Sequence, residues 1–430
     1  MSNVKASAVA PMLNVGLRMA TLVTKLALML YMGRYLSLAD MGAYGLVFGV
    51  VMIATALLGV RLDYVVSRDL VGITPLEALC RMRDQAVFYF FNYIVLFVVL
   101  IPVIVMNWGD AGNERAIFYI FTLSVVESYA GVVHSNVVSL GRPLLANVLF
   151  FIRAALWVFA VVGIGVAVPS LRTVDMILAC WLAGALLSLA VALALWWRMP
   201  WAAMLRTAID WKWIRNGIRK CFFIWLGTLG VTAGYYIDRF IVMHFLGLDY
   251  VGISTFYISF TSALHTLILS GVLSFSYPRL IVLHRDNDQA GFKREAQQTG
   301  WRVAIFSGVI AIGIGVGVPM LGYLFKRPEL VRETPTLIWL LAGTWIRSNA
   351  ETLYYILFAR HEDRAIWLGN LLFLLPAFGC PALFVYFFGF TGIGYGSLVS
   401  SSFLLMWRWR YVRGRKKKNY EINSAHESSC

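Results

Sequence analysis

Charged residues are scarce in this chain of 430 residues: Asp, Glu, Lys and Arg make up 14% of the sequence, and hydrophobic residues make up 60%. Because an average soluble domain carries about 25% charged residues, the composition excludes a soluble globular protein. Cysteine is also rare, and no CxxC pair or metal-binding spacing occurs. The five cysteines are Cys80, Cys180, Cys221, Cys380 and Cys430. We interpret them as packing residues and expect no metal site.

Two further absences exclude classes of function. The chain has no GxxxxGK[ST] phosphate loop, and its longest cytoplasmic loops, such as Arg61–Gln85 and Arg279–Gly300, run only about 20–25 residues. No nucleotide-binding domain fits in such loops, so we expect no ATP hydrolysis. Membrane-embedded glycosyltransferases carry acidic catalytic residues on large outer loops, and large outer loops are missing here. We therefore predict a protein that is not an enzyme and has no catalytic residues.

What the chain does contain is a succession of twelve apolar stretches. A helix needs about 20 apolar residues to cross the hydrocarbon core of a bilayer, so each stretch predicts one transmembrane helix. The predicted spans are Val9–Tyr35, Met41–Val60, Ala86–Met106, Ala116–Leu140, Leu145–Val168, Val174–Trp197, Cys221–Phe245, Val251–Pro278, Trp301–Phe325, Thr336–Ala359, Ile366–Phe388 and Ile393–Tyr411. The first stretch is too long for a signal-peptide core, so we expect it to be retained.

Positive charge is distributed unequally between the two ends of the predicted helices. With a cytoplasmic N-terminus, 26 of the 37 Lys and Arg residues fall in cytoplasmic segments, 6 on the outer side and 5 within spans. This bias predicts that both termini are cytoplasmic. The predicted fold class is an all-α integral membrane protein of about 12 transmembrane helices. We assign the formal net charge of +15, and the RGRKKK sequence of the tail, to contact with anionic lipid headgroups and not with nucleic acid.

A short loop sequence recurs at half the chain length. GRYLSLADMGAYG begins at Gly33 and MHFLGLDYVGIST begins at Met243, so that Leu36, Leu38 and Gly42 recur 210 residues later. Repeats at this spacing are common in transporters. The predicted domains are an N-terminal six-helix bundle (1–210), a C-terminal six-helix bundle (211–411) and a basic cytoplasmic tail (412–430). We expect the two bundles to surround a central cavity.

Ionisable residues recur inside the spans at helical spacing. One stripe in the first span contains Asn14, Arg18, Thr21 and Lys25, and its counterpart in the seventh contains Thr228, Thr232, Tyr235 and Arg239. Charged groups in a bilayer face the protein interior or a hydrated cavity, although Arg18 could also snorkel to the headgroups. The candidate substrate-path residues are Arg18, Lys25, Arg153, Arg239 and Arg347. Because these cations outnumber the acidic residues of the spans, the cavity is expected to attract an anionic substrate such as a pyrophosphate.

Four other ionisable residues of the spans are candidates for coupling to an ion. They are Glu127, His134, Asp238 and Glu351. With no ATP site, uphill movement would need a H+ or Na+ gradient, and a carboxylate is the usual carrier. Arg347 and Glu351 also stand at i, i+4, which suits an intrahelical ion pair, and His134 could be an ordinary interior histidine. No cofactor other than the coupling ion is expected.

The chain resembles the polysaccharide (O-antigen) flippases of the multidrug/oligosaccharidyl-lipid/polysaccharide exporter superfamily. The residues that carry the likeness are RYLSLADMGAYG from Arg34, GVRLDYVVSRDL from Gly59, YIDRFIVMHFLGLDYVGIS from Tyr236 and PRL from Pro278. The resemblance implies two six-helix bundles around a central cavity, and an activity that moves an undecaprenyl-diphosphate-linked oligosaccharide across the bacterial inner membrane. It implies partners in the lipid-linked substrate, membrane lipids, a glycan polymerase and a chain-length regulator.

Two other functions compete with this interpretation. One is an ion-coupled drug or cation antiporter of the same superfamily, which would favour acidic cavity residues over the cationic excess. The other is a lipid II flippase, a class that tends to carry more than twelve helices. Neither the sugars of the substrate nor the oligomeric state follows from the sequence.

The charge bias makes a prediction about topology. Single cysteines introduced at Asp286 and Ser424 should be labelled from the cytoplasm, and those at Asp110 and Glu329 from the outer side, because the basic segments stay inside. Labelling with a membrane-impermeant maleimide in intact cells and in inverted vesicles measures this. Labelling of the Asp286 position from outside would contradict the twelve-span topology.

Overall fold

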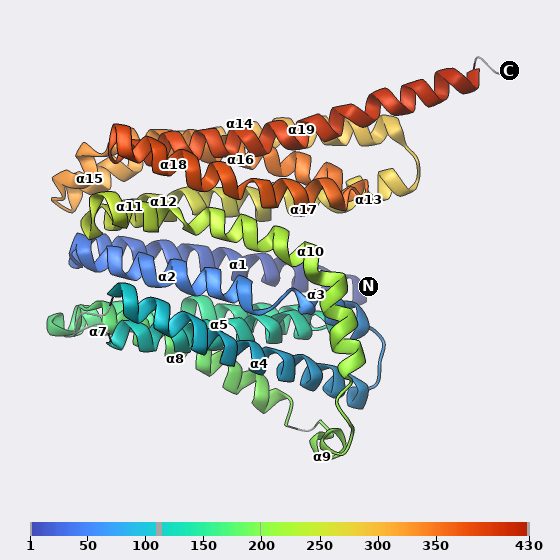
Figure 1. The fold of residues 1–430 in the computed structure, drawn as a ribbon, viewed down its shortest axis with the longest axis horizontal. Coiled ribbons are helices and arrows are strands. Elements are labelled where there is room, and N and C mark those ends of the chain that lie inside the picture. Colours follow the sequence, from blue (N-terminus) through green and yellow to red (C-terminus); the bar gives the residue numbers. More distant parts are fainter. Residues whose placement is uncertain (1, 109–113, 198, 428–430) are drawn as a thin grey trace. The chain divides into compact units, whose positions relative to one another are not determined.

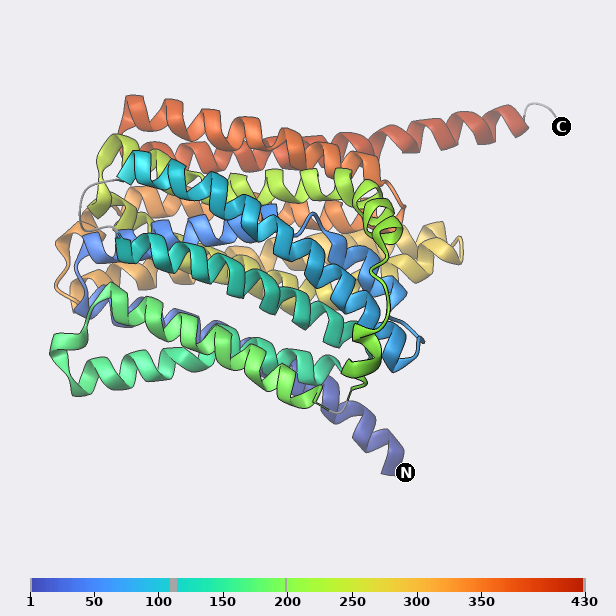
Figure 2. The same cartoon turned by 60° about the horizontal axis from the view of Figure 1, so that its bottom comes forward.

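The computed structural model describes residues 2–108, 114–197 and 199–427, so Asp110, Arg198 and Cys430 lie outside the described residues. Within that part of the chain every regular element is a helix, which confirms the predicted all-α fold class. The chain divides into two compact units, Met1–Thr232 (unit 1) and Ala233–Cys430 (unit 2). In each unit long helices run alongside one another (Figures 1 and 2).

Unit 1 is a bundle in which α2, α5 and α8 pack together and α1 packs on α6 and α7. Its elements are α1 (Ser2–Tyr35), α2 (Leu38–Leu58), α3 (Leu62–Asp69), α4 (Pro75–Trp108), α5 (Glu114–Ser139), α6 (Pro143–Phe151), the π-helical turn η1 (Ile152–Leu156), α7 (Trp157–Ala167), the 3-10 turn η2 (Pro169–Leu171), α8 (Val174–Leu195), α9 (Trp201–Leu205) and most of α10 (Trp211–Tyr236). Ser37 caps α2 through a capping box with Asp40.

Unit 2 is built around α16, which packs on α12, α14 and α19. Its elements are α11 (Asp238–Leu246), α12 (Leu248–Ile268), the π-helical turn η3 (Leu269–Leu273), α13 (Ser274–Arg285), α14 (Gln289–Leu324), α15 (Pro328–Arg332), α16 (Thr334–Ala359), α17 (Asp363–Leu372), α18 (Leu374–Phe388) and α19 (Thr391–Glu427). Buried residues of α16, such as Leu337, Leu341 and Ala350, form its core.

Each predicted span lies within one helix or two consecutive helices, apart from one or two residues at some C-terminal ends. Among the described residues, eight helical segments are long and apolar enough to cross a membrane by length and composition. The other four predicted spans lie in α4, α10–α11, α16 and α19. Of these, α16 contains Arg347, Asn349 and Glu351, polar residues that lower its mean hydropathy. The position of the helices therefore agrees with the sequence pattern.

Helix lengths show the repeat. α2 and α12 both have 21 residues, and their first residues, Leu38 and Leu248, are 210 positions apart, as the loop sequence predicts. α5 and α16 both have 26 residues, with first residues 220 positions apart at Glu114 and Thr334. The offset of 220 persists at the start of α6 and α17. Positions in the two units can therefore be matched residue by residue.

A polar clamp holds the segment that follows α8 against the N-terminal end of α4. The Arg83 guanidinium donates hydrogen bonds to the carbonyl oxygens of Met204, Thr207 and Ala208, at 2.6–2.9 Å. The backbone N–H of Trp213 and the Arg81 guanidinium donate to Asp210, and both hold the pKa of that carboxyl below its ordinary value. The clamp fixes the path of the chain into α10.

Close packing within unit 2 depends on small residues. A Cβ atom added at Gly396 of α19 would lie 2.6 Å from Cα of Pro381 in α18, so the two backbones touch there. Small residues allow such close approach of helices in membranes, where van der Waals packing drives helix association. Gly379, also in α18, has open space where its Cβ would be.

Because Gly396 is crowded and Gly379 is not, alanine substitutions at these two positions form a matched pair. Gly396→Ala forces a methyl group onto rigid backbone, so we expect a loss of about 1–3 kcal/mol and a melting temperature several degrees lower. Gly379→Ala should leave the melting temperature unchanged. Tryptophan fluorescence during thermal unfolding of the detergent-purified protein measures both. Equal melting temperatures for the two variants would contradict the close packing of α18 and α19.

Candidate functional site

The N-terminal part of the polar stripe of α1 contacts α6. Arg18 Nε donates to Asn147 Oδ1 at 3.4 Å, and Asn147 Nδ2 donates to Asn14 Oδ1 at 2.8 Å. Asn147 is buried, whereas the Arg18 side chain is exposed. The predicted stripe therefore joins two helices of unit 1 through an amide bridge and leaves the positive charge of Arg18 accessible.

Glu127 of α5 is held by donors on both carboxylate oxygens. The indole N–H of Trp181 in α8 donates to Oε1 at 2.6 Å, and Arg153 Nε lies 3.4 Å from Oε2. Arg153 belongs to η1, where a π-helical turn interrupts the helix α6–α7. Such turns place side chains differently from a regular helix and often occur at functional sites. Here the turn brings the predicted Arg153 and Glu127 together in an ion pair.

Lys25 lies near this ion pair but does not join it. Its charge interacts with those of Glu127 and Arg153, and its side chain is exposed. Within residues 2–108, 114–197 and 199–427, the Lys25 ammonium has no hydrogen bond and no ion pair. The cluster of Lys25, Glu127 and Arg153 therefore carries one uncompensated positive charge.

His134 lies about two helical turns from Glu127 on α5, too far for a hydrogen bond between the two side chains. Its Nδ1 atom lies 2.9 Å from the carbonyl oxygen of Ala146, and its ring packs on Phe150. These contacts join α5 to α6. The two residues, which share a helix face in the sequence, therefore have different surroundings in unit 1.

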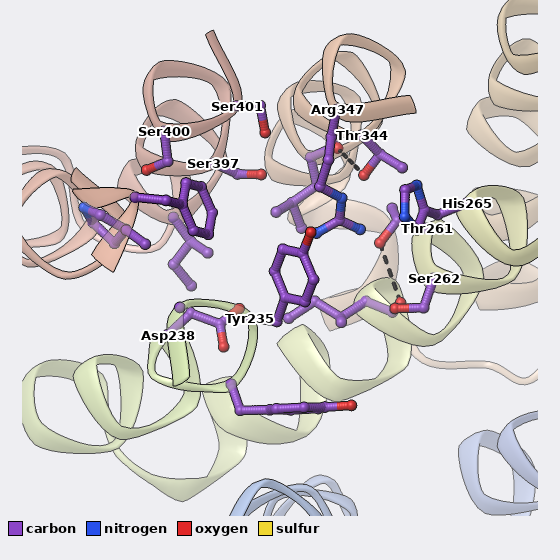
Figure 3. Close-up of a pocket in the computed structure, with 18 of the residues that line it drawn as sticks. Tyr235, Asp238, Thr261, Ser262, His265, Thr344, Arg347, Ser397, Ser400 and Ser401 are labelled. Carbon is purple, nitrogen blue, oxygen red and sulfur yellow. Dashed lines mark hydrogen bonds between the residues drawn. The ribbon is translucent and has the colours of Figure 1, made fainter. Parts of the chain in front are cut away.

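Unit 2 contains a cavity of about 230 Å³ (Figure 3). Its lining residues come from α10–α12, α16, α18, α19 and the turn before α18, and most of them are polar. They include Tyr235, Tyr236, Asp238, Thr261, Ser262, His265, Thr266, Thr344, Arg347, Phe373, Ser397, Ser400 and Ser401. The cavity thus holds Arg347 and Asp238, two of the residues that the sequence singles out. The sequence prediction rested on the ionisable residues of the spans, so the serine and threonine hydroxyl groups of this lining were not predicted.

Arg347 and Asp238 share this cavity without forming an ion pair. The Arg347 guanidinium lies over the Tyr235 ring at 4.5 Å from its centroid, and the Tyr235 ring contacts Phe373. Asp238 begins α11, and its Oδ1 accepts a hydrogen bond from the Arg239 backbone N–H at 2.8 Å. Arg239 itself is 4% exposed and lies over the Tyr236 ring, and it is not a lining residue of this cavity.

Glu351 pairs with Arg408 and not with Arg347, so the predicted intrahelical pair is wrong. Arg408 NH1 lies 3.0 Å from Glu351 Oε1, and the same guanidinium donates to the Ala350 carbonyl oxygen and to Asn370 Oδ1. Arg408 is 3% exposed and lies within the twelfth predicted span, Ile393–Tyr411. Helical spacing permits the pair with Arg347, but α19 places a better-hydrogen-bonded arginine against Glu351.

The repeat matches the two clusters position by position. Lys25 corresponds to Tyr235 at the offset of 210, while Glu127 corresponds to Arg347 and Arg153 to Phe373 at the offset of 220. In unit 1 Arg153 pairs with Glu127, and in unit 2 Tyr235 contacts both Arg347 and Phe373. Unit 1 therefore has two cations and one carboxylate at these positions, and unit 2 has one cation and two aromatic rings. No group of three His, Cys, Asp or Glu residues in the described chain could hold a metal ion.

Comparisons with known proteins show the fold. No protein-family model matches the chain, and no curated protein matches it. Among solved structures, an inward-facing multidrug resistance MATE family transporter of the MOP superfamily superposes with a TM-score of 0.76 at 15% identity, over 94% of this chain and 99% of that chain. The chain therefore has the two-bundle fold of MATE-like transporters.

Two further solved structures have a similar fold. A mutant of the Vibrio cholerae MATE transporter VcmN gives a TM-score of 0.57 at 12% identity, over 95% of this chain and 98% of that chain. A MOP superfamily transporter from Pyrococcus furiosus gives a TM-score of 0.57 at 12% identity, over 95% of each chain. That structure is described by a binding pocket of reverse polarity that suggests a different function.

The buried pair of unit 2 gives a prediction about stability. Arg408→Met leaves the Glu351 carboxylate buried without a counter-charge, which costs about 3–5 kcal/mol, so we expect much less folded protein. Adding Glu351→Met removes the orphaned charge and should restore most of the folded protein. Fluorescence-detected size-exclusion chromatography of the solubilised membranes measures both. A single variant as stable as the wild type would contradict the pairing.

Proposed function

We propose that the protein is a membrane transporter that moves an undecaprenyl-diphosphate-linked oligosaccharide across the bacterial inner membrane by alternating access. The shared fold with MOP superfamily transporters supports a transporter. The loop sequences that resemble polysaccharide flippases support the lipid-linked substrate. In this proposal the basic segments and both termini lie in the cytoplasm, and a glycan polymerase with its chain-length regulator receives the exported repeat unit.

One observation carries the proposal: cationic groups of the described spans remain without an ion pair after Glu127 and Glu351 have been paired. Glu127 is neutralised by Arg153, and Glu351 is neutralised by Arg408. The Lys25 ammonium has no ion pair in the described part of the chain. Because an ammonium facing lipid would be costly, a hydrated substrate path that holds phosphate oxygens is its favourable environment.

Asp238 favours a second candidate, an ion-coupled exporter of cationic drugs. Its carboxylate lines the cavity of unit 2 and accepts one backbone hydrogen bond, so its remaining lone pairs can receive a cation. The same group could carry the coupling H+ or Na+ of a flippase. Glu127 is less suited to that role, because donors already occupy both of its oxygens.

Export of surface glycan tests the proposed substrate. In a strain without its own copy, Lys25→Ala should lower export about tenfold or more, because one charge-assisted contact to phosphate is worth about 1.5–3 kcal/mol. Lys25→Arg, which keeps the charge, should retain most of the export. Immunoblotting of surface glycan, normalised to the amount of protein in the membrane, measures this.

The control removes the same charge outside the spans. Arg115, at the start of α5, is 81% exposed in its side chain and pairs with Asp175 of α8, so Arg115→Ala should export like the wild type. Full glycan export by Lys25→Ala would contradict the role of Lys25. If deletion of the protein left the surface glycan unchanged and raised the accumulation of a cationic dye, the drug exporter would replace the flippase.

A further inference from the structure

We propose that the cavity of unit 2 binds one acidic sugar residue of the transported glycan. Arg347 holds the sugar carboxylate, and Asp238 accepts a hydrogen bond from a sugar hydroxyl. The inference rests on the proposed function and goes beyond it, because it assigns a second site, inside one bundle, that distinguishes acidic from neutral sugars.

Arg347 is positioned as a receptor for an oxyanion. Its guanidinium makes no ion pair or hydrogen bond to any described residue, and its buried Nε lacks a partner. The Tyr235 ring, 4.5 Å from the guanidinium carbon, supports its flat face (Figure 3). Stacking on the ring fixes the plane of the Arg347 guanidinium, so the edge of this group can present parallel N–H donors to a carboxylate.

The repeat explains why this arginine lacks a carboxylate. In unit 1, Arg153 pairs with Glu127. In unit 2 the position of Glu127 is taken by Arg347, and the position of Arg153 is taken by Phe373, which packs on Tyr235. The matched position therefore offers Arg347 an apolar ring where unit 1 has a charged partner. A ligand carboxylate would supply the missing half of the pair.

The other lining groups select a sugar acid over a phosphate. A dianionic phosphate would be repelled by the Asp238 carboxylate in the same cavity, whereas a sugar hydroxyl can donate a hydrogen bond to it. The hydroxyls of Ser262, Ser397 and Ser401 also line the cavity, and none is hydrogen-bonded to another described residue. A volume of about 230 Å³ is below the range of about 300–1,000 Å³ of drug-sized pockets, so one sugar ring is a suitable occupant.

A small cation is a poorer occupant of this cavity. Asp238 is the one carboxylate among its lining residues, and the Arg347 guanidinium, which makes no ion pair with a described residue, stands in the same space. Coulomb repulsion from the guanidinium opposes a bound cation, and the same charge attracts an anion. His265 bonds to Ser348 through Nδ1 at 3.3 Å and adds a further polar group at the wall.

Equilibrium binding to the purified full-length protein in nanodiscs tests the proposal. The probes are glucuronate, glucose and inorganic phosphate, and isothermal calorimetry is the measurement. We expect saturable binding of glucuronate, no binding of glucose and weaker binding of phosphate. Arg347→Gln should weaken glucuronate binding at least tenfold, since a charge-assisted bidentate contact is lost. Tyr235→Phe keeps the stacked ring and should bind like the wild type, whereas Tyr235→Leu should bind more weakly.

Matched controls make each result interpretable. Arg302→Gln removes an exposed positive charge of α14 and should not change binding, and the melting temperature of every variant shows that it is folded. Phosphate binding as tight as glucuronate, or glucuronate binding that Arg347→Gln leaves unchanged, would overturn the proposal. Either result would leave the flippase intact if Lys25→Ala still lost glycan export. Unchanged surface glycan after deletion of the protein would instead refute the flippase itself.

Discussion

The pairing of buried carboxylates is the constraint on which both bundles depend. A carboxylate among apolar helices is tolerated only when opposite charges or hydrogen-bond donors surround it. Glu127 meets this requirement with Arg153 and Trp181, which join α5 to η1 and α8. Glu351 meets it with Arg408, which joins α16 to α19. In each unit one acidic residue therefore determines which helices must be neighbours and in which rotation.

The sequence predicted what depends on local pattern. Hydropathy located all twelve helical stretches, and a loop motif located the repeat, since α2 and α12 are equal in length and 210 residues apart. It failed where distant residues compete for one partner. Spacing within α16 allowed Glu351 to pair with Arg347, but Arg408, 57 residues away, forms the bond. The predicted twelfth span, Ile393–Tyr411, already contained Arg408, but spacing along one helix gave no sign of its partner on α16.

Matched positions of the two units are occupied by residues of different chemical type. Lys25, Glu127 and Arg153 form a charged cluster in unit 1, and the matched residues of unit 2 are Tyr235, Arg347 and Phe373. Each half therefore uses the same place in its bundle for a different electrostatic environment. The sequence showed the first match, from Lys25 to Tyr235, but the shift of the offset from 210 to 220 hid the other two. An insertion between the helices changes the offset without moving the site.

The clamp formed by Arg83 has a consequence for biosynthesis. Its acceptors are backbone carbonyls of residues 204–208, which lie more than 120 positions later in the chain. Until the ribosome has delivered that segment, the guanidinium at the start of α4 has none of these partners. The clamp of unit 1 can therefore form only after about half of the polypeptide has been synthesised, at the point in the chain where α10 begins.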